Sequence, residues 1–173
     1  FAGDYGCWAY AYALPGDALD SDTVVAIVSD HGFLPVTREI RLNVHLRRLG
    51  LLEVDAEGQV TRAAARLVMN HGAGYVYLAG GGERERTARD LVRALADIEG
   101  VAGVWTTEAY HGLGLPTPRE NALAGDLVLE AAPGFCFGDE ARGEEVHAAP
   151  RYRGTHGQRP THPDNAAFFL AAG

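Results

Sequence analysis

Short apolar runs separated by turn-forming residues dominate the chain. The clearest run is residues 23–29, Thr-Val-Val-Ala-Ile-Val-Ser, which is continuous rather than alternating. A continuous β-branched run is typical of a strand that is buried on both faces in a parallel sheet. We therefore predict a central strand here, ending abruptly at Asp30-His31-Gly32.

Two segments have the period of a helix. Apolar residues alternate with arginines from residue 41 to a stop at Gly50, which predicts a short helix over 41–50. The stretch 83–98 is the clearer helix, because Leu91, Leu95 and Ile98 share one face while arginines lie on the other.

Further strands are predicted at five places, and a hairpin loop at 55–58. These strands are 73–79, 101–107, 126–131, 135–137 and 166–171. Residues 138–165 show no such pattern, and a connection of that length is often functional. The element order predicts an α/β fold with at least one parallel sheet and a mixed or antiparallel part, in a single domain over residues 1–173.

Composition narrows the classes of function. The 173 residues carry a net charge of −8, and all 15 basic residues are arginines. An acidic chain is a poor binder of nucleic-acid backbones, and one without lysine has no Schiff-base or Walker lysine. No apolar run approaches the roughly 20 residues of a membrane-spanning helix, so we predict neither a nucleic-acid nor a membrane partner. Cys7 and Cys136 are too few for a disulfide scaffold.

Two short motifs could carry chemistry. Asp30 and His31 follow the predicted central strand, and ligand sites of open α/β sheets lie off the carboxyl ends of strands. A carboxylate beside an imidazole can chelate a divalent metal, although the same pair could simply form a polar turn. His156 lies between glycines at 154–157 and is either a second ligand or a surface histidine.

Together these motifs resemble a known family. Strand-Ser-Asp-His-Gly-Phe at 29–33, then Gly-Thr-His-Gly at 154–157 with two prolines and Phe-Phe at 168–169, resemble the alkaline phosphatase superfamily, above all the type I phosphodiesterase/nucleotide pyrophosphatase family. The resemblance covers residues 23–173. It implies an alkaline-phosphatase-like sheet with flanking helices and a two-metal hydrolase of phosphodiester or pyrophosphate bonds, usually with zinc. It assigns Asp30 and His31 to one metal and His156 to the other.

The resemblance also implies what this chain lacks. The family's early aspartate ligand, its Thr or Ser nucleophile and a further Asp-x-x-x-His pair have no counterpart, since Asp4 is followed four residues later by Trp8. We therefore expect the C-terminal part of such an enzyme, with the N-terminal half absent. It would hold three of six protein metal ligands, bind metal weakly or partially, and be inactive alone for want of a nucleophile. The parent enzyme would act on a phosphate-ester small molecule or nucleotide.

Other interpretations stay open. The chain could belong to a phosphomonoesterase, sulfatase or phosphonate hydrolase branch, or be a non-catalytic binding or assembly module. His71 could lie near the site, although a turn before the strand at 73–79 is the favoured interpretation. No metal role is assigned to the histidines at 45, 111 and 147, and His162 is the substitute ligand if the chain collects metal. If the strand at 23–29 lacks a neighbour, its apolar edge predicts self-association.

Overall fold

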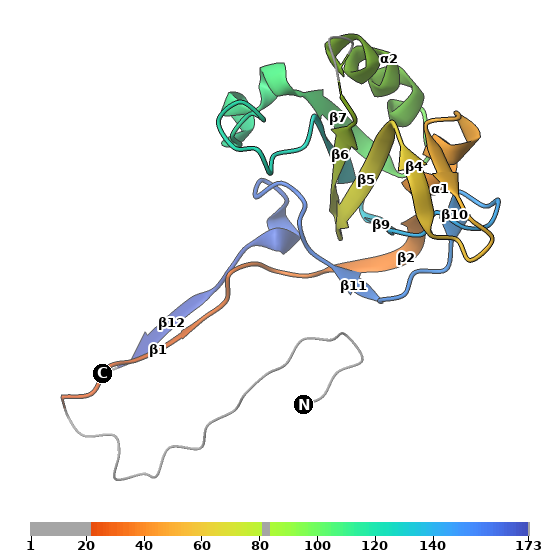
Figure 1. Ribbon diagram of the computed structural model, residues 1–173. Coiled ribbons are helices and arrows are strands. Elements are labelled where there is room, and N and C mark those ends of the chain that lie inside the picture. The colour runs from red at the N-terminus through yellow and green to blue at the C-terminus, as the bar shows by residue number, and fades with distance from the viewer. Residues whose placement is uncertain (1–21, 81–83, 173) are drawn as a thin grey trace.

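The structure is a computed structural model that describes residues 22–80 and 84–172 (Figure 1). Predictions for residues 1–21 therefore lie outside the described part of the chain. Within it, no helix is long and apolar enough to cross a membrane. The elements are, in order, β1 (Val25–Val28), β2 (Leu34–Ile40), α1 (Leu42–Arg48), β3 (Leu52–Val54), β4 (Val60–Ala63), β5 (Ala65–Asn70), β6 (Ala73–Leu78), α2 (Arg84–Ala96), β7 (Val101–Thr106), β8 (Leu127–Ala131), β9 (Gly134–Phe137), β10 (His147–Ala148), β11 (Gly154–Thr155) and β12 (Phe169–Ala172).

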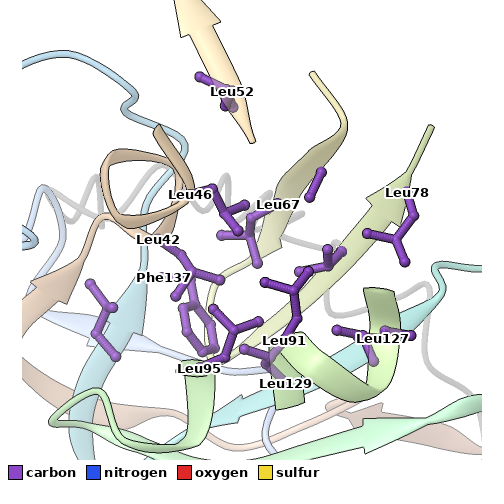
Figure 2. Close-up of a cluster of buried hydrophobic side chains, with 14 of the residues drawn as sticks. Leu42, Leu46, Leu52, Leu67, Leu78, Leu91, Leu95, Leu127, Leu129 and Phe137 are labelled. Carbon is purple, nitrogen blue, oxygen red and sulfur yellow. The ribbon is translucent and has the colours of Figure 1, made fainter. Parts of the chain in front are cut away.

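An antiparallel sheet with strand order β5-β6-β8-β7 forms the body of the molecule. Its strands alternate, so that Leu127 and Leu129 of β8 enter the core while the side chains between them lie on the other face. Both helices contribute to the same core, and Figure 2 shows their leucines beside those of the sheet. The helix predicted over 83–98 and the strand predicted over 126–131 are thus confirmed as α2 and β8.

A second sheet is built on β2. This strand is the longest in the described part of the chain, and the sequence analysis did not predict it. β2 pairs in parallel with β9 and antiparallel with β10 and β11. The β2–β9 pair supplies the predicted parallel component. Leu34, Val36 and Ile40 are buried, but Pro35 and the polar residues between them interrupt the apolar pattern.

The strand β1 exists as predicted, but its predicted burial in a parallel sheet is wrong within the described residues. β1 pairs only with β12, antiparallel, in a two-stranded ribbon that extends away from the body (Figure 1). Ile27 is 57% exposed, Val28 62% and Phe169 70%. A two-stranded ribbon has two open faces, so an apolar strand is buried only where other layers cover it. Over residues 22–80 and 84–172 the observed fold is mixed α/β, with two α-helices and several small sheets.

Candidate functional site

The two predicted motifs meet where the ribbon joins the body. The chain leaves β1, passes through residues 29–33 and enters β2, whose first residue Leu34 pairs with Thr155 of β11. The backbone N–H of Gly32 donates to the carbonyl of Asn165 at 3.0 Å. As a result the imidazoles of His31 and His156 stack, with ring centroids 4.1 Å apart and ring planes 14° apart.

A third imidazole joins this pair. His71 forms the turn between β5 and β6 with a φ of 55°, a left-handed conformation uncommon outside glycine. Its ring centroid lies 4.8 Å from that of His156. The N–H of Gly72 donates to the His156 carbonyl at 2.7 Å, and the N–H of Phe137 donates to the His71 carbonyl at 2.8 Å. The sequence interpretation as a turn residue is confirmed, but its place in the site was missed.

The tautomer of His31 follows from its hydrogen bond. Its Nδ1 lies 2.7 Å from the Gly32 carbonyl. A carbonyl only accepts, so Nδ1 carries the proton and the neutral ring keeps its lone pair on Nε2. That Nε2 lies 3.5 Å from Oδ1 of Asp30, and the same Oδ1 accepts from the His31 backbone N–H at 3.1 Å. Asp30 and His31 therefore present two donor atoms side by side.

His156 is held in its neutral form. Burial, and then the neighbouring imidazoles of His31 and His71, lower the pKa of His156 below its ordinary value of 6.5, against a smaller opposing effect of Asp30. A neutral imidazole at physiological pH has a lone pair available for a proton or a metal.

The donor types suit zinc, but the described residues do not complete a site. Across residues 22–80 and 84–172, no three His, Cys, Asp or Glu side chains are grouped so that one ion could bind them. The stacked rings of His31 and His156 direct their in-plane lone pairs into two nearly parallel planes, which do not converge. Metal binding by Asp30, His31 and His156 therefore stays a prediction.

A cavity of about 630 Å³, within the size range of small-molecule sites, borders His71 but is not lined by His31 or His156. His71 and Thr155 line it on the side of the histidines, and Arg66 and Arg151 lie elsewhere on its wall. The predicted loop 138–165 supplies part of this wall as well as His156, so it lies at the candidate site as a functional loop would.

Two of the other histidines have structural partners. His111 contacts Glu120 at 3.1 Å, and Nε2 of His147 lies 2.8 Å from the Glu99 carbonyl. Cys136 is a buried free thiol, and burial raises its pKa to about 11.

Comparison with known proteins gives a family and a fold. The profile of the family described as type I phosphodiesterase / nucleotide pyrophosphatase matches residues 11–159. No curated protein matches the chain significantly. Phosphonoacetate hydrolase from Sinorhizobium meliloti 1021 is similar in structure, with a TM-score of 0.54 at 17% identity in its phosphonoacetate complex and 0.53 at 19% in its phosphonoformate complex. Murine ectonucleotide pyrophosphatase/phosphodiesterase 5 gives a TM-score of 0.49 at 16% identity.

These matches cover most of this chain but only part of each solved structure. Each covers 87% of this chain, but only 36% of the phosphonoacetate hydrolase and 34% of the murine protein. The chain therefore spans about a third of the length of these solved structures, and at such identities the likeness concerns the fold. The family profile covers most of the chain, including the Ser-Asp-His-Gly-Phe and Gly-Thr-His-Gly motifs. The chain belongs to the type I phosphodiesterase/nucleotide pyrophosphatase family.

Proposed function

We propose that this chain carries part of the active site of a two-metal hydrolase that cleaves phosphodiester or pyrophosphate bonds. Asp30 and His31 would bind one divalent metal and His156 the other, with zinc the expected ion. The observation that carries the proposal is the stacking of His31 on His156, at 4.1 Å, by two motifs at opposite ends of the described chain. A purely structural pair of turns has no need to bring these imidazoles together.

The geometry of Asp30 and His31 supports a chelate. Two donors at zinc distances of about 2.0–2.2 Å and a tetrahedral angle lie about 3.4 Å apart. The separation of Asp30 Oδ1 and His31 Nε2 is 3.5 Å. The Gly32 carbonyl that fixes the proton on Nδ1 plays the part that second-sphere acceptors play for metal-bound histidines.

The parallel rings support two ions rather than one. Paired metals in phosphoryl-transfer sites lie about 3.5–4 Å apart and bind the attacking and leaving oxygens of an in-line displacement. The rings of His31 and His156 are 4.1 Å apart and nearly parallel, so each can serve a different ion of such a pair. The chemistry that the metals supply is charge neutralisation at phosphorus and a lowered pKa of the nucleophile.

The nucleophile and the other ligands are proposed to come from the part of the family's length that this chain does not span. The chain by itself is therefore proposed to be inactive. Its substrate in the whole enzyme would be a small phosphate ester or nucleotide. Phosphonates, phosphomonoesters and sulfate esters are the alternatives within the superfamily, and an assay with each distinguishes them.

Metal content tests the proposal directly. The chain, purified without chelators and incubated with zinc, is measured by mass spectrometry beside His31→Ala, His156→Ala and the control His111→Ala, whose ring is 72% exposed and away from the site. We expect the two site variants to bind less zinc than the wild type and the control to match it. Equal zinc in all four proteins would contradict the assignment. In parallel, turnover of a nitrophenyl phosphodiester by the chain alone would show that no nucleophile is missing.

A further inference from the structure

A row of side chains leads from the candidate metal donors into the large cavity. The ring centroid of His71 lies 4.8 Å from that of His156, and the centroid of Tyr152 lies 6.0 Å from that of His71, in an edge-on arrangement. The Arg151 guanidinium lies over the Tyr152 ring, 5.4 Å from its centroid. His71, Tyr152 and Arg151 all line the cavity of about 630 Å³. We call these three residues the donor strip.

Each member of the donor strip has an available hydrogen-bond donor. Within the described ranges no residue forms a hydrogen bond with the ring nitrogens of His71 or with the Tyr152 hydroxyl, and these atoms are not buried, so solvent reaches them. Arg151 is exposed and has no ion pair with any described residue. A neutral imidazole carries one N–H group, a phenol carries an O–H group, and a guanidinium carries several N–H groups. A ligand in the cavity therefore meets three donors in a row.

The backbone holds His71 at the edge of the cavity at a conformational cost. Its φ of 55° is one that glycine adopts without strain, and strained residues of this kind cluster at ligand sites. Two hydrogen bonds fix the turn, from the Gly72 N–H to the His156 carbonyl at 2.7 Å and from the Phe137 N–H to the His71 carbonyl at 2.8 Å. The imidazole of His71 is thus kept between His156 and the cavity.

The carboxylates of the cavity wall leave the donor strip unoccupied. Glu39 is paired with Arg41 at 3.1 Å. Asp139 and Glu140 also line the wall, but both are exposed, and neither forms an ion pair with Arg151. Because the repulsion of exposed carboxylates is screened by water and salt, they do not prevent an anion from binding to the strip.

We propose that the donor strip binds a phosphate group of the substrate other than the one that reacts. The planar guanidinium of Arg151 matches the oxygens of a phosphate, and the imidazole and phenol add neutral donors. The contact of His71 with His156 would place this group next to the phosphate held at the proposed metals. The substrate would then be a small molecule with two neighbouring phosphate groups. This role in the substrate rests on the proposed hydrolase function, whereas binding of the anion to the strip does not.

Inorganic pyrophosphate tests the site in the full chain without metal. The chain is stripped of metal and titrated with pyrophosphate at constant ionic strength, and the histidine ring signals are followed in carbon–proton NMR spectra. We expect the His71 signals to shift and saturate, while those of His111, whose ring is 72% exposed and away from the cavity, stay in place. Absence of a saturable shift at His71 would overturn the proposal.

Variants locate the bound anion. Arg151→Gln should weaken pyrophosphate about tenfold or more, as expected for the loss of a charge-assisted hydrogen bond. Arg153→Gln makes the same change of charge two residues farther along, at an exposed position that does not line the cavity, and should stay within about twofold of the wild type. Tyr152→Phe keeps the ring and should weaken binding about threefold, and it serves as the second variant if Arg151→Gln fails to fold. Equal weakening by Arg151→Gln and Arg153→Gln would show diffuse attraction and exclude the strip.

The zinc measurement separates this proposal from the hydrolase function. Pyrophosphate binding that depends on Arg151 in a chain that takes up no zinc would support the anion site and contradict the metal assignment. Zinc bound through His31 and His156 in a chain that does not bind pyrophosphate would support the metal assignment and overturn the donor strip.

Discussion

The position of His156 depends on a glycine that no other residue can replace without moving backbone. Gly157 has a φ of +99°, and a Cβ there would lie 2.6 Å from the Asn70 carbonyl oxygen and 3.3 Å from the Ala73 nitrogen. Gly143 also has a positive φ, +76°, but a Cβ there would meet nothing within 4 Å. Gly157→Ala and Gly143→Ala therefore share the conformational cost and differ in crowding.

The magnitudes separate the two variants. An L-residue in the left-handed region costs about 1–2 kcal/mol, and Gly143→Ala should lose that much. Gly157→Ala pays the same cost, adds about 1–3 kcal/mol for overpacking, and strains the neighbouring Gly72–His156 backbone bond, worth about 1 kcal/mol. We expect a loss of about 3–6 kcal/mol in the free energy of unfolding for Gly157→Ala.

Urea unfolding followed by circular dichroism measures both losses. The ring signals of His31 and His156 in carbon–proton NMR spectra should shift in Gly157→Ala and stay in place in Gly143→Ala, because only the first moves the loop that carries His156. Equal losses of stability in the two variants, or unchanged ring signals in folded Gly157→Ala, would refute the reasoning.

Three further predictions concern stability and association. Asn43 is buried and joins α1 to the body by three hydrogen bonds, because it donates to the carbonyls of Leu67 and Asp139 and accepts from the Leu67 N–H. Asn43→Leu should therefore lower the free energy of unfolding, measured by chemical denaturation, by about 3 kcal/mol. A loss under about 1 kcal/mol would contradict this count of hydrogen bonds. Because the folded pKa of His156 lies below the unfolded value of 6.5, the unfolded state binds more protons as the pH falls through that value. Stability should therefore decline from pH 7 toward pH 5, and less steeply in His156→Asn; parallel profiles would argue against it. The exposed ribbon should drive self-association, and light scattering that shows only an 18.5 kDa monomer would exclude this.

The sequence analysis predicted those elements that can be recognised from residues close together in the chain. The α2 helix shows one helical period and one buried face, and the β8 strand is buried along its whole length. The loop at 55–58 joins the antiparallel strands β3 and β4, as predicted. β2 was missed because Leu34, Val36 and Ile40 are separated by proline and polar residues, whereas β5 was missed although most of its residues are apolar. β2 forms a strand because β9, β10 and β11, which are distant in the sequence, pair with it. β5 instead pairs with the adjacent β6 across the turn at His71.

The residues of the candidate site likewise fall into those that the sequence predicted and one that it did not. Asp30, His31 and His156 stand in motifs that the sequence displays, whereas His71 stands in an Asn-His-Gly turn like many others. Its place beside His156 follows from the hydrogen bond between Gly72 and the loop after β11. Only the tertiary packing of the β5–β6 turn reveals it, and a sequence signal for it would have required pairing information between these two segments.

Two features of the described residues lack the partners that their sequence predicts, and they lie next to each other in the chain. Strand β1 has the apolar sequence of a strand covered on both faces, yet Ile27 and Val28 are exposed. Two residues farther along, Asp30 and His31 present a chelating pair without a third donor. Further strands and helices placed against the β1–β12 ribbon would bury the apolar faces and lie at the end of β1 where donors are lacking. A covering layer of the kind proposed for the whole enzyme would account for both features, whereas an unrelated turn at residues 29–33 accounts for neither. This coincidence supports the proposed two-metal site over a binding module that kept only the fold.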